Sequence, residues 1–218
     1  VQASRWTKLA DGTGFIHSFN GPHSLFVDTI RSCRALAVAH QLGHVLMGEQ
    51  DAKISLLQRV VEHALNTARY NIYYGEGRDA YDVRGRTAHE AVFNTASGVF
   101  RCPNSQQGYS PFSTWTRGLS WALCGFAEQV EFIGSLRRTK IDLFPDGAVI
   151  PSEITDFLGV GVEEIVQDSI SGGNAGSIEA AVLGKFVQAA QATADFYLEN
   201  SCADGVPMWD TGAPNLHR

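Results

Sequence analysis

Residues 105–126 combine a polar loop with the start of a helix, and this combination is suited to binding an anionic sugar. Arg117 and Trp121 are four residues apart, so both lie on one face of the expected helix and stack one above the other. A guanidinium can hold a carboxylate through two hydrogen bonds, and an indole ring can stack on a sugar. The loop supplies further polar groups at the same end of the helix: Gln106, Gln107 and Tyr109. A core tryptophan beside a surface arginine has the same spacing, so the pattern alone leaves both interpretations open.

Two other residues invite a functional interpretation. Asp28 stands between Val27 and Ile30 in a mainly apolar run, where an ionised group needs a reason to be present. A carboxylate favoured by the dipole at a helix start is the alternative reading of this position. His89 is a lone histidine beside an expected strand, which is more often a structural or exposed residue. The residues themselves therefore assign no role to either side chain.

No residues have the spacing of a metal site. His40 and His44 are one helical turn apart, but no HExxH motif or third ligand accompanies them. The four cysteines are widely spaced and form no CxxC motif, which favours a reducing compartment: Cys33, Cys102, Cys124 and Cys202. We therefore expect no metal, no cofactor and a cytoplasmic location.

The bulk composition limits the classes of partner. A chain of 218 residues can build one sizeable core, and its net charge of −6 is unfavourable for binding nucleic acid. One or two cationic side chains at the site would still be enough to bind an anionic sugar. No stretch approaches the roughly 20 apolar residues that span a bilayer, so we expect no membrane partner. The chain starts at Val1 rather than Met, from which we expect the natural N-terminus to be missing.

Hydrophobic periodicity predicts long helices joined by elaborated loops. Helices are expected over 24–42, with Ser24 as the N-cap, and over 51–70, with Asp51 or a near neighbour as the cap. Further helices are expected over 115–133 and 177–200, with a short one over 162–170. Residues 1–23 read as irregular, and 73–101 as a partly β excursion between helices. Helices without regularly alternating strands favour an all-α domain.

The motif Gln-Gly-Tyr-Ser followed by Trp-x-Arg-Gly-x-x-Trp-Ala, over 107–122, resembles the signature of glycoside hydrolase family 88, the unsaturated glucuronyl hydrolases. Gln106 stands where the family usually has His. The resemblance covers about 18–128 and resumes near 189–214. It implies an (α/α)6 barrel with the site at one end of the toroid, with the β excursion as an elaboration.

The resemblance also implies roles for individual residues. Asp28, in Ser-Leu-Phe-Val-Asp-Thr-Ile, matches the segment that carries the catalytic Asp. Substrate-binding roles are implied for His89, Gln106, Gln107, Arg117 and Trp121. The segment Asp-Gly-Val-Pro-Met-Trp-Asp resembles a family stretch with Tyr in place of Met208, so Trp209 and Asp210 are expected to line the cleft. A tryptophan that plugs the core and an aspartate that caps a turn remain the alternative for these two.

The implied activity is removal of the terminal 4,5-unsaturated uronic acid from oligosaccharides that lyases have produced. Asp28 would protonate C4 of the C4=C5 double bond and then activate a water that attacks C5. An unsaturated rhamnogalacturonyl hydrolase and a non-catalytic carbohydrate-binding relative are the alternatives. The partner in each case is an unsaturated uronic-acid oligosaccharide, and the sequence indicates no oligomeric state.

Two parts of the family pattern have no counterpart in the chain. The second acid of the family lies upstream of the Asp28 segment, and the upstream acid here, Asp11, stands in a different context. The family's serine segment lies beyond the Trp-Asp stretch, and the chain ends before it. We therefore expect residues 1–218 to form a single catalytic domain that is incomplete at both ends.

Overall fold

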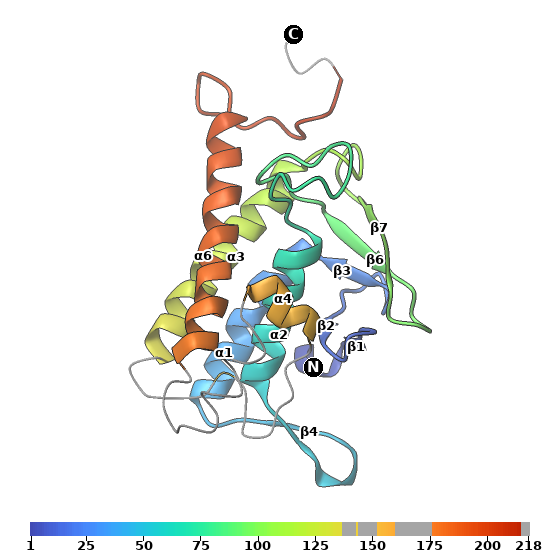
Figure 1. Cartoon of the computed structure of the whole chain (residues 1–218), viewed down its shortest axis with the longest axis vertical. Coiled ribbons are helices and arrows are strands. Elements are labelled where there is room, and N and C mark those ends of the chain that lie inside the picture. Colours follow the sequence, from blue (N-terminus) through green and yellow to red (C-terminus); the bar gives the residue numbers. More distant parts are fainter. Residues whose placement is uncertain (137–142, 144–151, 160–175, 215–218) are drawn as a thin grey trace.

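The computed structural model describes residues 1–136, 143, 152–159 and 176–214, and helices make up nearly half of this part (Figure 1). The α-helices are α1 (Cys33–Gln41), α2 (Leu56–Tyr70), α3 (Thr116–Leu136), α4 (Ser152–Leu158) and α6 (Gly176–Glu199). Short 3-10 helices are η1 (Gln2–Ser4), η2 (Val27–Ser32) and η3 (Glu49–Asp51). The helix expected over 162–170 lies outside the described residues.

Within the described residues, three small antiparallel sheets accompany the helices. They pair β1 (Trp6–Lys8) with β2 (Gly14–Ile16), β4 (Leu46–Met47) with β5 (Lys53–Ile54), and β6 (Glu90–Phe93) with both β3 (Ser24–Phe26) and β7 (Phe100–Asn104). The excursion over 73–101 therefore contains β6 and the start of β7. The first 23 residues, expected to be irregular, contain the β1–β2 hairpin.

The expected helix over 24–42 is wrong in its first half. Ser24–Phe26 is a strand, Val27–Ser32 is a 3-10 helix, and α1 begins only at Cys33. Ser24 caps no helix: its backbone pairs with β6 and its hydroxyl donates to Glu90. Pairing with a strand more than 60 residues away overrides the local periodicity here.

The start of α2 also differs from its prediction. The helix begins at Leu56, and the Ser55 hydroxyl caps it by accepting a hydrogen bond from the Gln58 N–H at 3.2 Å. Asp51 has a positive φ of 59° and belongs to the turn between β4 and β5. The apolar residues that follow the three- and four-residue spacing of α2 are buried: Leu56, Leu57, Val60, Val61, Ala64 and Ala68.

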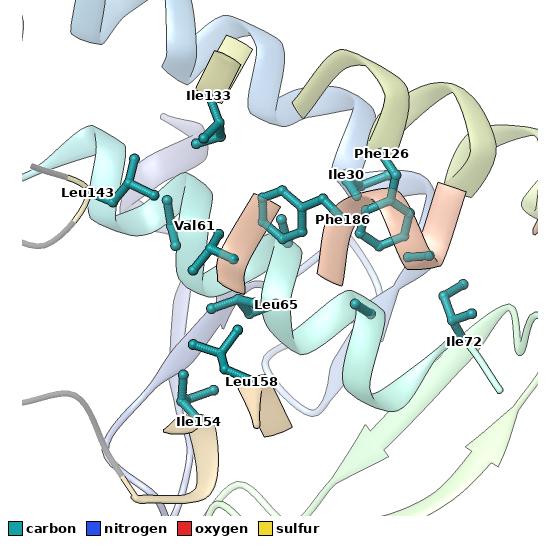
Figure 2. Close-up of a cluster of buried hydrophobic side chains, with 14 of the residues drawn as sticks. Ile30, Val61, Leu65, Ile72, Phe126, Ile133, Leu143, Ile154, Leu158 and Phe186 are labelled. Atoms are coloured by element: carbon teal, nitrogen blue, oxygen red, sulfur yellow. The ribbon is translucent and has the colours of Figure 1, made fainter. Parts of the chain in front are cut away.

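One core cluster joins η2, α2, α3, α4 and α6 (Figure 2). Phe126 of α3 meets Phe186 of α6 with ring centroids 6.0 Å apart, and α3 and α6 lie side by side in Figure 1. Gly125 of α3 lies directly against Ile30 of η2, where a β-carbon would collide with the Ile30 side chain. This close approach seats η2 on α3. Among the described residues, no helix combines the length and the apolar character needed to cross a membrane.

We predict that stability falls in acid because of His63, which is buried in α2. Burial lowers the pKa of His63 from 6.5 to about 3, and its Nδ1 accepts a hydrogen bond from the Ile16 N–H. Below pH 6.5 the unfolded chain therefore binds a proton that the folded chain does not. Above pH 6.5, His63 is neutral in both the folded and the unfolded chain, so it adds no pH dependence to the stability. As the pH falls from 6.5 toward 3, the free energy of unfolding should fall by up to about 1.4 kcal/mol per pH unit.

Urea unfolding between pH 7.5 and pH 4.5 measures this slope. The free-energy difference between the wild type and His63→Gln should shrink as the pH falls, because the variant lacks the titrating ring. The exposed His44 supplies the control, and His44→Gln should keep the wild-type slope. Parallel pH profiles for the wild type and His63→Gln would contradict the prediction.

Candidate active site

The pairing of β3 with β6 brings Asp28 and His89 together. Phe26 is opposite Glu90 in the antiparallel register, and the Val27 N–H donates to the His89 carbonyl at 3.0 Å just beyond the last pair. Asp28 is the next residue after Val27, in the first turn of η2. Two residues that are 61 positions apart in the sequence thus become neighbours in space.

Asp28 presents a free carboxylate oxygen to His89. Its Oδ1 lies 3.7 Å from His89 Nε2, and this buried oxygen has no hydrogen-bond partner among the residues that the structure describes. The Asp28 side chain as a whole is 34% exposed, whereas that of His89 is 2% exposed. A carboxyl that is reachable from solvent on one side and faces an imidazole on the other is suited to proton transfer.

The orientation of the His89 ring is fixed on several sides. Its Nδ1 accepts the backbone N–H groups of Gln106 at 3.1 Å and Gln107 at 3.4 Å. Neutral His89 therefore carries its proton on Nε2, which faces Asp28. The ring is stacked on Phe26, with centroids 4.8 Å apart, and contacts Trp115 at 4.6 Å.

Glu90, which follows His89, is a fully buried carboxylate that the sequence analysis missed. Three amides donate to it, from Asn20 at 3.0 Å, Asn104 at 2.7 Å and Gln106 at 2.9 Å, and the Ser24 hydroxyl adds a fourth bond. Burial alone raises the pKa of Glu90, but these hydrogen bonds outweigh it and leave the pKa below its ordinary value. The signal in the sequence was a glutamate inside the apolar strand Ala-His-Glu-Ala-Val-Phe.

Arg117 and Trp121 have other partners than the ones expected. The exposed Arg117 guanidinium lies 4.8 Å from the Trp115 ring centroid and donates to Gln107 Oε1 at 3.3 Å. Trp121 is half-buried, and its ring has the guanidinium of Arg31 at 5.5 Å. The predicted Arg117–Trp121 stack is therefore not formed: Arg117 pairs with Trp115, and Arg31 pairs with Trp121. Arg117 and Gln107 nevertheless lie together beside His89.

The tail supports the loop that carries Gln106 and Gln107. Asp210 is fully buried, and its carboxylate accepts the N–H of Tyr109 at 2.8 Å and that of Gly212 at 2.9 Å. This geometry is that of a turn-capping aspartate, the alternative that the sequence left open. Trp209 is 56% exposed, so it does not plug the core. Gly108 is needed because a β-carbon would lie 2.6 Å from Ser105 Oγ and 2.9 Å from Asp210 Oδ2.

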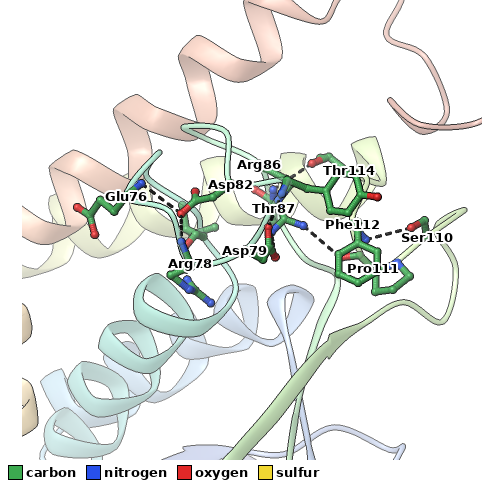
Figure 3. Close-up of polar contacts among 12 residues, drawn as sticks. Glu76, Arg78, Asp79, Asp82, Arg86, Thr87, Ser110, Pro111, Phe112 and Thr114 are labelled. Carbon is green, nitrogen blue, oxygen red and sulfur yellow. Dashed lines mark hydrogen bonds and ion pairs between the residues drawn. The ribbon is translucent and has the colours of Figure 1, made fainter.

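A second group of polar contacts, within residues 75–87, is bonded to the segment just before α3 (Figure 3). The Asp82 carboxylate accepts three backbone N–H groups, those of Gly75, Glu76 and Arg78. Arg86 forms an ion pair with Asp79 at 2.6 Å. The Thr87 N–H donates to Thr114 Oγ1 at 3.0 Å, which ties this network to the residues just before α3.

Comparisons with known proteins point to one group. No family model matches the sequence. The unsaturated glucuronyl hydrolase of Formosa agariphila is 23% identical over 158 residues, which are 72% of this chain and 25% of that protein. The solved unsaturated glucuronyl hydrolase of Bacillus sp. GL1, responsible for the degradation of glycosaminoglycan, is 18% identical with a TM-score of 0.57. The chain is similar to the unsaturated glucuronyl hydrolases.

Two further solved structures of unsaturated glucuronyl hydrolases agree with this result. One enzyme is specific for heparin (17% identity, TM-score 0.56), and the other was solved with dGlcA-Glc-Rha-Glc (18% identity, TM-score 0.56). Each of the three solved structures covers 98% of this chain, and this chain covers 40% of each of them. The likeness shows that the chain shares the fold of part of an unsaturated glucuronyl hydrolase.

Asp11 has a structural role in this fold. Its Oδ1 accepts the Thr13 N–H and hydroxyl, and its Oδ2 pairs with Arg69 at 2.7 Å. These bonds close the turn between β1 and β2 and tie it to α2. Within the described residues, no group of three or more histidine, cysteine, aspartate or glutamate side chains could hold a metal ion.

We predict that Asp210→Asn destabilises the loop at 105–110. The new amide would turn an NH2 group toward one of the two backbone N–H groups that the carboxylate now accepts, and the free energy of unfolding should fall by about 1–3 kcal/mol. Urea unfolding measures the loss, and hydrogen exchange of the Tyr109 amide locates it. Asp204 in the same tail is exposed and, among the described residues, accepts a hydrogen bond only from the Val206 N–H, so Asp204→Asn is the matched control. Equal stability of the two variants would refute the supporting role of Asp210.

Proposed function

We propose that this chain carries the site of a glycoside hydrolase that removes the terminal 4,5-unsaturated uronic acid from lyase-generated oligosaccharides. The observation that supports the proposal most strongly is the Asp28 carboxyl beside His89, with an oxygen that accepts no hydrogen bond within the described part of the chain. The similarity to unsaturated glucuronyl hydrolases supplies the reaction class. The helices would then form part of an (α/α)6 barrel, because the chain spans 40% of those solved structures.

The proposed chemistry begins with Asp28 as an acid. Protonated Asp28 donates its proton to C4 of the substrate, and the electrons of the C4=C5 bond form the new C–H bond. A water then attacks C5 and returns a proton to the Asp28 carboxylate, so the residue ends in its starting form. The resulting hemiketal opens to a ketone at C5, the sugar ring breaks, and C1 releases the next sugar.

His89 would keep Asp28 correctly positioned relative to the substrate. Its Nε2 lies 3.7 Å from the buried Asp28 oxygen, so a shift of about 0.5–0.8 Å would bring the two atoms to hydrogen-bond distance. Such tightening is expected when a substrate fills a site. The stacked Phe26 ring keeps the imidazole from tilting while this occurs.

Arg117 and Gln107 would bind the uronate carboxylate. The Arg117 guanidinium is exposed, and its one hydrogen bond in the described structure, to Gln107 Oε1, is long at 3.3 Å. Its other N–H groups can therefore form the two parallel bonds that a carboxylate accepts. Trp121 offers an aromatic face for stacking, with Arg31 against its ring. In this arrangement Arg117 serves the substrate rather than Asp28.

We predict that Asp28→Asn abolishes turnover, because an amide neither donates a proton to C4 nor accepts one from water. The measurement is the ultraviolet absorbance of the conjugated C4=C5 uronate during incubation with unsaturated chondroitin or heparin disaccharides. The wild type should bleach the absorbance, and Asp28→Asn should be slower by at least about 10³-fold. Asp156 on the surface of α4 provides the control, and Asp156→Asn should keep the wild-type rate.

Full turnover by Asp28→Asn would refute the role of Asp28. A folded wild type that binds the disaccharide without loss of absorbance would favour a non-catalytic carbohydrate-binding protein. Disaccharides with rhamnose instead of glucosamine after the unsaturated sugar test for a rhamnogalacturonyl hydrolase.

We predict that Arg117→Ala acts mainly on substrate binding. Loss of charge-assisted hydrogen bonds should raise KM about tenfold or more, with a smaller effect on kcat. Arg117→Lys should recover only part of the loss, since an ammonium lacks the planar fork of the guanidinium. Initial rates over a range of disaccharide concentrations separate the two constants, and the exposed Arg101 gives the control Arg101→Ala. An unchanged KM in Arg117→Ala would exclude Arg117 from the carboxylate site.

A further inference from the structure

Glu90 connects the sheet to the orientation of the His89 ring. It lies on β6 directly after His89, and its buried carboxylate accepts the Gln106 side-chain amide at 2.9 Å. The backbone N–H of the same Gln106 donates to His89 Nδ1 at 3.1 Å. Gln106 is thus bonded to Glu90 through its side chain and to the imidazole of His89 through its main chain.

The ring contacts of His89 do not determine which tautomer the imidazole adopts. Stacking on Phe26 and contact with Trp115 restrict the plane of the imidazole. Stacking does not decide which nitrogen carries the proton, because a neutral imidazole has two tautomers. The two N–H groups at Nδ1 decide it, since only an unprotonated Nδ1 can accept them.

We propose that Glu90 is a positioning residue: by holding Gln106, it keeps two backbone N–H groups on His89 Nδ1 and so directs the Nε2–H toward Asp28. This inference rests on the proposed function for its effect on catalysis. The tautomer of His89 is a property of the chain itself and can be tested separately.

The other partners of Glu90 support this role. Asn20, Ser24 and Asn104 come from the segment before β3, from β3 and from β7, so the carboxylate is held by the sheet on both sides. Gln106 itself is exposed and lies in the loop after β7. The rigid sheet thereby fixes a loop residue, and the loop residue fixes the imidazole.

The test measures the nitrogen chemical shifts of His89 in the ¹⁵N-labelled full chain at neutral pH. In the wild type, Nε2 should be protonated and Nδ1 unprotonated. Glu90→Gln leaves one acceptor oxygen among four donors, so Gln106 should be released and both tautomers should appear. Gln106→Met should give the same result, and because this side chain is exposed, the variant avoids disturbing the core. The control is Asp11→Asn, which removes another mostly buried carboxylate that does not touch His89.

Turnover of the unsaturated disaccharide gives the second readout. In Glu90→Gln and Gln106→Met, kcat should fall roughly 10- to 100-fold while KM stays nearly unchanged, and Asp11→Asn should keep the wild-type kcat. A wild-type His89 protonated on Nδ1, or a single Nε2–H tautomer in Glu90→Gln or Gln106→Met, would overturn the positioning role. If the wild type turns over no disaccharide, the proposed function fails, whereas the nitrogen shifts still decide the role of Glu90.

Discussion

The antiparallel register between β3 and β6 is the constraint on which the candidate site depends. It places Phe26 opposite Glu90, continues through the bond from the Val27 N–H to the His89 carbonyl, and so delivers Asp28 to the imidazole. A shift of one residue would turn every side chain of β3 to the other face of the sheet. Ser24 opposes such a shift, because its hydroxyl is bonded to the buried Glu90. The residues that set the register are therefore the same ones that build the site.

Two glycines of α3, Gly118 and Gly125, allow the segment that follows β3 to pack closely on the helices. Gly125 lets Ile30 pack directly against α3, and Gly118 lets Val27 approach within 3.3 Å of where its β-carbon would be. Both contacts seat η2, the short helix that carries Asp28, on the long helix that carries Arg117 and Trp121. Asp28 and the residues proposed to bind the substrate, Arg117 and Trp121, thus lie on one packed unit whose core continues to α6 (Figure 2).

Local periodicity was sufficient for the long helices and insufficient for the short strands. The stripes that predicted α2 and α3 are mainly buried, as expected from repeats of three and four residues. Periodicity predicts a helix over Ser24–Phe26, because strand pairing with β6 leaves no local signal in three residues. In the site, the family motif located the residues around His89, but periodicity could not show that Arg117 meets Trp115 instead of Trp121. Glu90 was missed because its four donors come from separate segments of the chain.

The measurement that tests the central claim most directly is a double-mutant cycle between Asp28 and His89, read as kcat/KM for an unsaturated disaccharide. If the sheet register makes the two residues act as one unit, Asp28→Asn with His89→Gln should lose little more activity than the worse single variant. The coupling free energy should then be at least about 1 kcal/mol. Losses that simply multiply, so that each residue acts independently of the other, would contradict the account.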